Sequence, residues 1–308
     1  MRVAVADLGT NACKLLIAEG NGLAFRVTEE VRRQTRLGEC LDAEGNLTSE
    51  GEGRLIAALR TFAELAQAAG VGNVRAYATS ALREAPNAQA VVARVREASG
   101  IKPVIISGER EGKLTYLGAA HSSGFGPDNL LLDLGGGSLE LARGGPEQAG
   151  VVVSLPLGAV RLHREVLFEE PPGAQAVAAL ERRVTETLAS HLDPFRVNQN
   201  TRVFGSSGTF QALGAAIASR QGAARVSEHK AGGFTFEVGA LGELLRELQD
   251  LTPAQRIQAG IEPLRTDIIV AGAAVLHAAL RTVGAERVTV SGGALREGML
   301  LEAFAAGP

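Results

Sequence analysis

Two aspartates, Asp7 and Asp133, each end a short apolar run and are followed at once by a glycine turn. The turns are Gly9-Thr10-Asn11 and residues 135–138, which read Gly-Gly-Gly-Ser. Glycine lets backbone N–H groups approach an anion closely. A carboxylate beside those groups would repel phosphate unless a hard divalent cation lay between them. The two segments therefore indicate a site for phosphate together with Mg²⁺ (or Mn²⁺).

Two further glycine-rich turns follow strand-like runs. Residues 205–209 (Gly-Ser-Ser-Gly-Thr) stand directly before an expected helix, and Ser291-Gly292-Gly293 precedes the last helix. A helix N-terminus is a favourable place for an anion, because its N–H groups and its dipole both face the ligand. A chain with 38 glycines must contain some such turns by chance, but four of them directly after strands favour a phosphate site.

Apolar periodicity predicts the same order of elements twice. In the first half we expect strands at 2–8, 14–18 and 23–31, a helix at 55–69, a strand at 74–78, a helix opened by Pro86, a strand at 103–106 and a helix at 110–120. In the second half we expect strands at 129–134, 139–142 and 150–155, a helix at 174–191, a strand at 202–204, helices near 240–249 and 266–281, a strand at 287–290 and a C-terminal helix. The two aspartates lie 126 residues apart, which favours an internal duplication over coincidence.

The loop-rich segment 121–128 lies between the two copies. It predicts two domains, residues 1–122 and 123–308, and the final helix (about 295–306) is expected either in the second domain or packed back on the first. A length of 308 residues agrees with two domains.

The composition is that of a globular protein, with 45% hydrophobic and 21% charged residues. A net charge of −3 gives no reason to expect nucleic-acid or membrane binding. Only four of the 31 basic residues are lysine, and the rest are arginine. Arginine binds phosphate through its planar guanidinium group, although a GC-rich genome would produce the same bias.

Two cysteines and five scattered histidines form no disulfide framework or metal-ligand pattern. Neither a secretory signal nor a membrane span is evident, so we expect a cytoplasmic protein.

Seven segments of this sequence resemble the exopolyphosphatase and guanosine pentaphosphate phosphohydrolase (Ppx/GppA) family, in its short form. They span almost the whole chain, at residues 7–11, 36–38, 78–87, 107–111, 133–140, 154–158 and 291–298. The first and fifth segments would also fit other actin-like ATPases. The stretches 78–87 (ATSALREAPN) and 107–111 (SGERE) are far more specific. The resemblance implies an α/β fold, a duplicated ribonuclease-H-like (actin/ASKHA-type) two-domain fold with an interdomain active-site cleft.

The resemblance also assigns roles to acidic residues. Glu111 matches the general base that activates the attacking water, with Glu109 as its rival two residues earlier. Asp133 and Glu140 match the carboxylates that hold the metal and position water, and Asp7 is their counterpart in the first domain. Without the motifs, Glu111 would be an ordinary helix-start acid and each aspartate an ordinary turn residue.

Phosphate-binding roles are implied for the turns and for several basic residues, Arg265 and Arg296 being expected from the second domain. The residues are Gly9, Thr10, Asn11, Lys14, Arg83, Gly136, Gly137, Ser138, Ser207, Gly208, Thr209, Arg265 and Arg296.

Four positions depart from the family pattern. Ala12 and Lys14 stand where serine and arginine are usual, Leu139 replaces a threonine and Gly112 an alanine. Lys14 keeps a positive charge but loses the bidentate geometry of arginine, which predicts a weaker grip on phosphate. None of the four changes removes a candidate catalytic carboxylate.

The expected activity is Mg²⁺-dependent hydrolysis of the terminal phosphate of inorganic polyphosphate, with short chains preferred. Removal of the 5′-phosphate of guanosine pentaphosphate uses the same chemistry, and the motifs do not separate the two substrates. An ATP-binding actin-like kinase and a non-catalytic phosphate sensor stay open as alternatives of another class, although Glu111 would have no task in a kinase. Members of the family often pair, so a homodimer is also kept open.

Overall fold

The computed structural model describes residues 1–222 and 232–307, and within it the chain forms two compact units. Unit 1 comprises Met1–Gly118 and Leu295–Pro308, and unit 2 comprises Ala119–Ala294. The chain passes from the first unit to the second inside helix α4 (Gly108–Ser123) and returns just before helix α11 (Leu295–Ala305). The first crossing lies close to the boundary predicted at 122/123, and the final helix belongs to unit 1.

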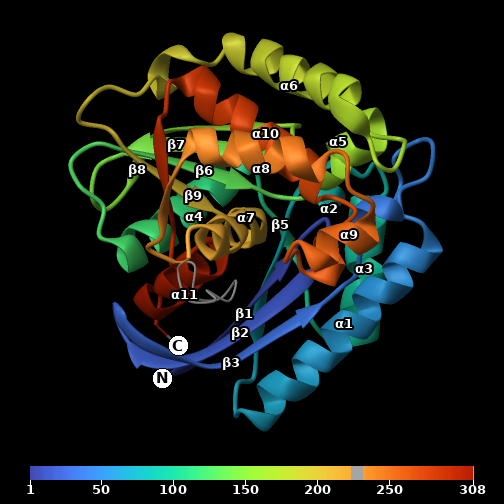
Figure 1. Ribbon diagram of the computed structural model, residues 1–308. Helices are drawn as coiled ribbons and strands as arrows, with labels where there is room; N and C mark the ends of the chain where they lie inside the picture. Colours follow the sequence, from blue (N-terminus) through green and yellow to red (C-terminus); the bar gives the residue numbers. More distant parts are fainter. Residues whose placement is uncertain (223–231, 308) are drawn as a thin grey trace. The chain divides into compact units, whose positions relative to one another are not determined.

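Unit 1 is built on a five-stranded sheet with the order β3-β2-β1-β4-β5. The strands are β1 (Arg2–Leu8), β2 (Cys13–Asn21), β3 (Ala24–Arg33), β4 (Val74–Ala78) and β5 (Val104–Ile105). The first three form an antiparallel meander, seen side by side in blue in Figure 1, and β4 and β5 continue the sheet in parallel. Helices α1 (Ser49–Ala68), α2 (Ser80–Glu84) and α3 (Ala88–Ser99) complete this part of the unit.

Both faces of β1 are buried, which explains its nearly unbroken apolar sequence. Ala4, Ala6 and Leu8 belong to the core that contains the buried residues of α1 and α3. Val3 and Val5 point to the other face, into the core formed with α4 and α11. Asp7 follows them on that second face, because side chains alternate along a strand.

Unit 2 is built on a six-stranded sheet with the order β10-β11-β9-β6-β7-β8. The strands are β6 (Asn129–Leu134), β7 (Leu139–Gly144), β8 (Ala149–Leu155), β9 (Arg202–Ser206), β10 (Thr235–Glu237) and β11 (Arg287–Val290). Without the edge strand β10, the order β8-β7-β6-β9-β11 repeats that of unit 1, with the same antiparallel meander and parallel continuation. This repetition confirms the predicted duplicated ribonuclease-H-like fold.

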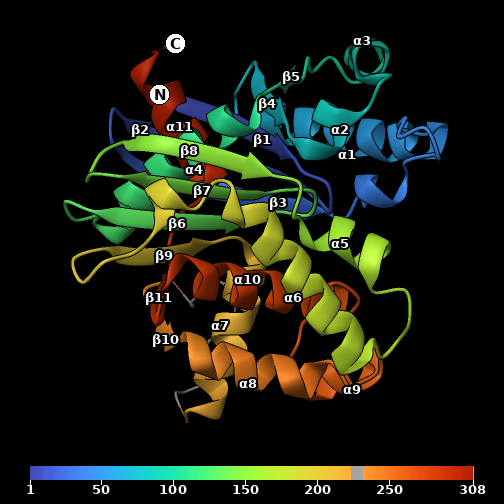
Figure 2. The same cartoon turned by 90° about the horizontal axis from the view of Figure 1, so that it is seen from above.

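Helices cover one face of the second sheet (Figure 2), and their apolar faces form the largest core of the protein. They are α5 (Ala159–Val166), α6 (Gly173–Ala189), α7 (Gly208–Arg220), α8 (Val238–Leu248) and α10 (Ile269–Val283). The short helix α9 (Pro253–Gln258) also belongs to unit 2, but its buried residue is Arg256 and it adds nothing to this core. The apolar pattern does not predict α5, α9 or β10, because segments of eight, six and three residues are too short to show a period. None of the described helices is long and apolar enough to cross a membrane.

The contact between α11 and α4 in unit 1 depends on Gly298, since a Cβ atom there would collide with the backbone carbonyl of Leu114. We expect Gly298→Ala to lower the free energy of unfolding by about 1–3 kcal/mol, the usual cost of overpacking. Gly53→Ala in α1 is the matched control, because a Cβ atom on Gly53 meets nothing within 4 Å. It should raise the free energy of unfolding by about 0.5–1 kcal/mol. Chemical denaturation of both variants measures this, and equal effects would contradict the packing argument.

Candidate active site

The two aspartate turns have the same backbone structure. In the first, the Gly9 N–H donates to the Ala12 carbonyl at 3.2 Å, and in the second the Gly135 N–H donates to the Ser138 carbonyl at 2.9 Å. Within the described part of the chain, the N–H groups of the two central residues of each turn donate no hydrogen bond. Each turn therefore offers two adjacent backbone donors, the arrangement that binds phosphate oxygens.

Neighbouring segments hold the carbonyl groups of the first turn. The backbone N–H groups of Arg36 and Gly38 donate to the carbonyls of Asn11 and Thr10, both at 2.9 Å. The Asn11 side chain is also held, because its Oδ1 accepts from Gln34 Nε2 at 2.9 Å. These hydrogen bonds hold the turn in place and occupy the carbonyl oxygens of Thr10 and Asn11 and the side-chain oxygen of Asn11.

Helix α5 does the same for the second turn. The Arg161 N–H donates to the Gly136 carbonyl at 3.0 Å, and the Arg161 Nε donates to the Gly137 carbonyl at 2.9 Å. The backbones come so close that a Cβ atom on Gly158 would collide with Gly136 and Gly137. Arg161 was not among the predicted site residues. A hydrogen bond from an arginine side chain to a backbone carbonyl has no recognisable sequence motif.

Asp133 belongs to a polar row that runs across four strands of unit 2. It faces Glu140 on β7 and Ser206 on β9, and Glu140 faces Ser154 on β8. Residues in register on neighbouring strands project from the same face of a sheet. Glu140 is 1% exposed, and its Oε1 accepts from Ser154 Oγ at 2.7 Å. The two carboxylates predicted to hold a metal are therefore direct neighbours.

This donor set suits Mg²⁺. No group of three or more histidine, cysteine, aspartate or glutamate side chains that could hold a metal occurs among the described residues. Mg²⁺ is usually held by only one or two carboxylates, with water and substrate phosphates completing its shell. The hard oxygens of Asp133 and Glu140 thus fit a magnesium or manganese site that a phosphate substrate completes, rather than a closed structural site.

The equivalent row of unit 1 has the opposite charge. Asp7 faces Lys14 on β2 and Tyr77 on β4, and Lys14 faces Arg32 on β3. Burial raises the pKa of Asp7 above its ordinary value, while the charges of Lys14 and Arg296 lower it and that of Glu297 raises it. The first copy of the duplicated site is therefore dominated by cations and suits an anion.

Glu111 and Arg83 form a buried ion pair in unit 1. Glu111 lies in the first turn of α4 and is 7% exposed, and its Oε2 accepts from an Arg83 guanidinium N–H at 2.7 Å. The same nitrogen donates to the Ile106 carbonyl at 3.3 Å. Glu109 differs: its side chain is 63% exposed and pairs with Lys113 at 2.5 Å. Burial therefore favours Glu111 over Glu109 as the reacting carboxylate.

The third turn joins β9 to α7 and is capped by its own serine. Ser207 adopts φ +124°, and its Oγ accepts from the N–H groups of Thr209 and Phe210 at 3.1 and 3.3 Å. The Arg265 guanidinium lies directly against Gly208, where a Cβ atom would collide with it. Arg265 is 7% exposed, and its Nε is 3.2 Å from Glu262 Oε2. The predicted residues Ser207, Gly208, Thr209 and Arg265 are thus together at one helix N-terminus.

A fully buried arginine that sequence analysis missed supports this corner of unit 2. Arg256 is 0% exposed; it pairs with Glu170 at 2.9 Å and donates to the carbonyl of Thr266, next to Arg265, at 2.8 Å. It therefore fixes the segment that presents the Arg265 side chain.

The remaining predicted residues are placed differently. Arg296, expected from the second domain, lies in unit 1 and pairs with Glu30 at 2.7 Å. In the fourth turn, Ser291 Oγ donates to the Gly293 carbonyl at 2.8 Å, so this turn is closed on itself.

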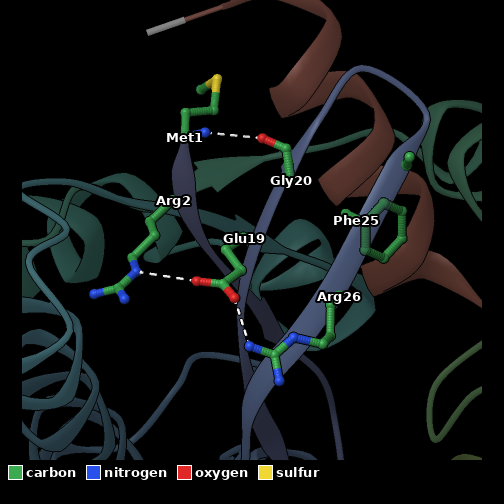
Figure 3. Close-up of a pocket in the computed structure, with 7 residues that line it drawn as sticks. Met1, Arg2, Glu19, Gly20, Phe25 and Arg26 are labelled. Carbon is green, nitrogen blue, oxygen red and sulfur yellow. Dashed lines mark hydrogen bonds and ion pairs between the residues drawn. The ribbon is translucent and has the colours of Figure 1, made fainter.

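A surface hollow of about 670 Å³ lies at the other end of the β1–β2 hairpin from the Asp7 turn (Figure 3). Arg2 and Arg26 line it, and both pair with Glu19, at 3.5 and 2.5 Å. None of its lining residues belongs to the predicted site, and its two arginines share the single carboxylate of Glu19.

Comparisons of this chain with known proteins give one consistent result. A model of the Ppx/GppA phosphatase family matches residues 16–306. "Exopolyphosphatase 1" of Mycobacterium tuberculosis is 34% identical over 305 residues, which cover 98% of this chain and 88% of that protein. An exopolyphosphatase structure from Cytophaga hutchinsonii is 25% identical with a TM-score of 0.90, and the match covers 99% of this chain and 98% of that one. A Ppx/GppA family member from Aquifex aeolicus is 27% identical with a TM-score of 0.81, over 100% and 99% of the two chains.

Because the pKa of Asp7 is raised in the folded protein, an ionised Asp7 lowers the free energy of unfolding. The folded protein binds the Asp7 proton more tightly than the unfolded chain, so the cost is present at neutral pH and vanishes below the ordinary pKa of 3.8. We expect Asp7→Asn to raise the free energy of unfolding at pH 7, and the gain to disappear as the pH falls towards 3.8.

Urea denaturation at several pH values measures the effect. Asp193→Asn is the control, because the Asp193 side chain is 96% exposed, and it should change stability by less than about 0.5 kcal/mol. An Asp7→Asn variant that is less stable at pH 7 would show that Lys14 and Arg296 outweigh burial.

Proposed function

Because this chain belongs to the Ppx/GppA phosphatase family, we propose that it is a phosphoanhydride hydrolase that removes the terminal phosphate of inorganic polyphosphate as orthophosphate. The name of its mycobacterial relative supports polyphosphate as the substrate. The observation on which the proposal rests is the buried Glu111, which Arg83 holds in place at 2.7 Å.

In the proposed reaction Glu111 takes a proton from the water that attacks the terminal phosphorus. Arg83 orients the Glu111 carboxylate through one guanidinium nitrogen, and its other N–H groups are suited to a phosphate oxygen. The attack needs a carboxylate held at a fixed position, and burial with an ion pair provides this more firmly than the exposed Glu109 would.

Within each unit, the central backbone N–H groups of the aspartate turn are suited to substrate oxygens, whereas the N–H groups of Thr209 and Phe210 already donate to Ser207 Oγ. Lys14 adds a positive charge in the first unit, and Arg265 adds one beside the third turn. These donors are fixed before substrate arrives, so they stabilise the charge of the transferred group without rearrangement.

Asp133 and Glu140 are the residues we propose for the divalent cation. Mg²⁺ or Mn²⁺ bound there supplies positive charge that offsets the growing charge on the transferred phosphoryl group. Asp7 is the weaker candidate for a metal ligand, because Lys14 and Arg296 already face it.

The polyphosphate proposal is tested by measuring orthophosphate release from short-chain polyphosphate, guanosine pentaphosphate and ATP, each with Mg²⁺ and with a chelator. We expect release from polyphosphate to be fastest and to stop on chelation. Release mainly from guanosine pentaphosphate would support that rival substrate, release mainly from ATP would favour the ATP-binding alternative, and no release from any substrate would indicate a sensor.

Glu111→Gln tests the assignment of the general base. The variant should keep the Arg83 contact but cannot take a proton, so kcat should fall by about 10²- to 10⁴-fold. Glu109→Gln is the matched control two residues away and should change kcat less than about 2-fold, since the Glu109 carboxylate is exposed and its ion pair with Lys113 is at the surface. A fall in kcat for Glu109→Gln with Glu111→Gln unaffected would reverse the assignment.

A further inference from the structure

Ser206, the last residue of β9, has a hydroxyl group that no part of the proposed mechanism uses. The residue is 2% exposed, and its Oγ is buried without a hydrogen-bond partner in the part of the chain that the structure describes. A buried hydroxyl without a partner has lost its bonds to water and gained none in return, which costs folding free energy. A serine kept at such a position calls for an explanation.

The register of the sheet places this hydroxyl beside the two proposed metal ligands. Ser206 pairs with Asp133, and Asp133 pairs with Glu140, so the three side chains share one face. The preceding Gly205 confirms the alternation, because a Cβ atom there would collide with Phe210, in the core on the opposite face. Ser206 thus occupies the β9 end of the row, while Ser154 at the β8 end is bonded to Glu140.

The backbone of the next residue, Ser207, is strained. Ser207 has φ +124°, a backbone conformation that L-residues rarely adopt. In the described part of the chain only Arg36 and Ser207 combine a side chain with positive φ, and the Arg36 N–H binds the first aspartate turn. Backbone strain of this kind persists where surrounding structure holds it, often at ligand sites. An orphaned hydroxyl and a strained backbone therefore coincide beside Asp133.

We propose that the Ser206 hydroxyl is the third oxygen of the divalent-cation site, together with the carboxylates of Asp133 and Glu140. A hydroxyl oxygen is a hard donor that suits Mg²⁺ and Mn²⁺, and it adds a ligand without adding negative charge that would repel phosphate. The inference rests on the proposed function, which places the cation at Asp133 and Glu140.

The first test compares Ser206→Ala with the native full-length chain by titrating Mn²⁺ in a calorimeter without substrate. We expect the affinity for Mn²⁺ to fall roughly 10-fold. Without metal, in the presence of a chelator, the thermal midpoint of Ser206→Ala should rise, because the variant removes a hydroxyl that has no partner.

The matched control is Thr289→Val in the neighbouring strand β11. Its hydroxyl is bonded to that of Thr235 at 2.8 Å, so removing it should lower the thermal midpoint and leave Mn²⁺ affinity unchanged. The opposite signs of the two midpoint shifts separate an orphaned hydroxyl from a bonded one.

Ser206→Cys tests direct ligation. A thiolate prefers softer ions, so this variant should bind Cd²⁺ more tightly than the native chain does while its affinity for Mg²⁺ falls. A hydroxyl that only fills space would change neither preference.

Three outcomes distinguish failure of this inference from failure of the proposed cation site. Unchanged Mn²⁺ affinity in Ser206→Ala, with affinity lost in Asp133→Asn, would overturn the role of Ser206 alone. A lowered midpoint in Ser206→Ala would show a structural serine and would also overturn it. Unchanged Mn²⁺ affinity in Asp133→Asn would overturn the cation site itself.

Discussion

The register between the central strand and its neighbours is the constraint on which the polar row of each unit depends. Asp7 on β1 and Asp133 on β6 each lie one residue before the end of a strand that pairs with an antiparallel hairpin partner on one side and a parallel strand on the other. A slip of one residue would move each aspartate to the opposite face of its sheet, among apolar side chains. Because both faces of these strands are packed, that slip would bury a carboxylate in a core. The hydrophobic cores therefore hold the polar rows in place.

Duplication has let the two copies of this scaffold specialise. The position opposite the central aspartate is Lys14 in unit 1 and Glu140 in unit 2, and the next strand contributes Arg32 and Ser154 respectively. One backbone plan thus presents a basic row suited to phosphate and an acidic row suited to a divalent cation. Lys14 in place of the more usual arginine changes the geometry of that charge but not its sign.

Much of the scaffold could be predicted from sequence, because alternation and flanking turns are local signals. The strands Val74–Ala78, Asn129–Leu134 and Arg287–Val290 occur with the bounds that the apolar pattern predicts. Contacts between segments that are distant in sequence could not be predicted. Arg161 and Arg256 donate hydrogen bonds to backbone carbonyls, and in sequence such an arginine cannot be distinguished from one exposed to solvent. The motif match assigns the base to Glu111, with Glu109 as its rival. The burial that favours Glu111 depends on how α4 packs and could not be predicted from sequence.

Charge alone does not mark a functional site in this protein. Asp128 and Arg143 in unit 2 form an equally polar cluster, in which Arg143 binds both oxygens of Asp128 at 2.8 and 2.7 Å and Thr201 donates to Asp128 at 2.6 Å. Arg143 chiefly lowers the pKa of Asp128, so this cluster stabilises the fold at neutral pH, and both carboxylate oxygens of Asp128 accept hydrogen bonds from the protein. The candidate site has the opposite character, since Ser206 Oγ and the central N–H groups of both turns have no protein partner in the described chain. Groups that folding leaves unsatisfied are the ones that a ligand can satisfy, and Ser206 Oγ and the central N–H groups of the turns are such groups beside Asp133 and Asp7.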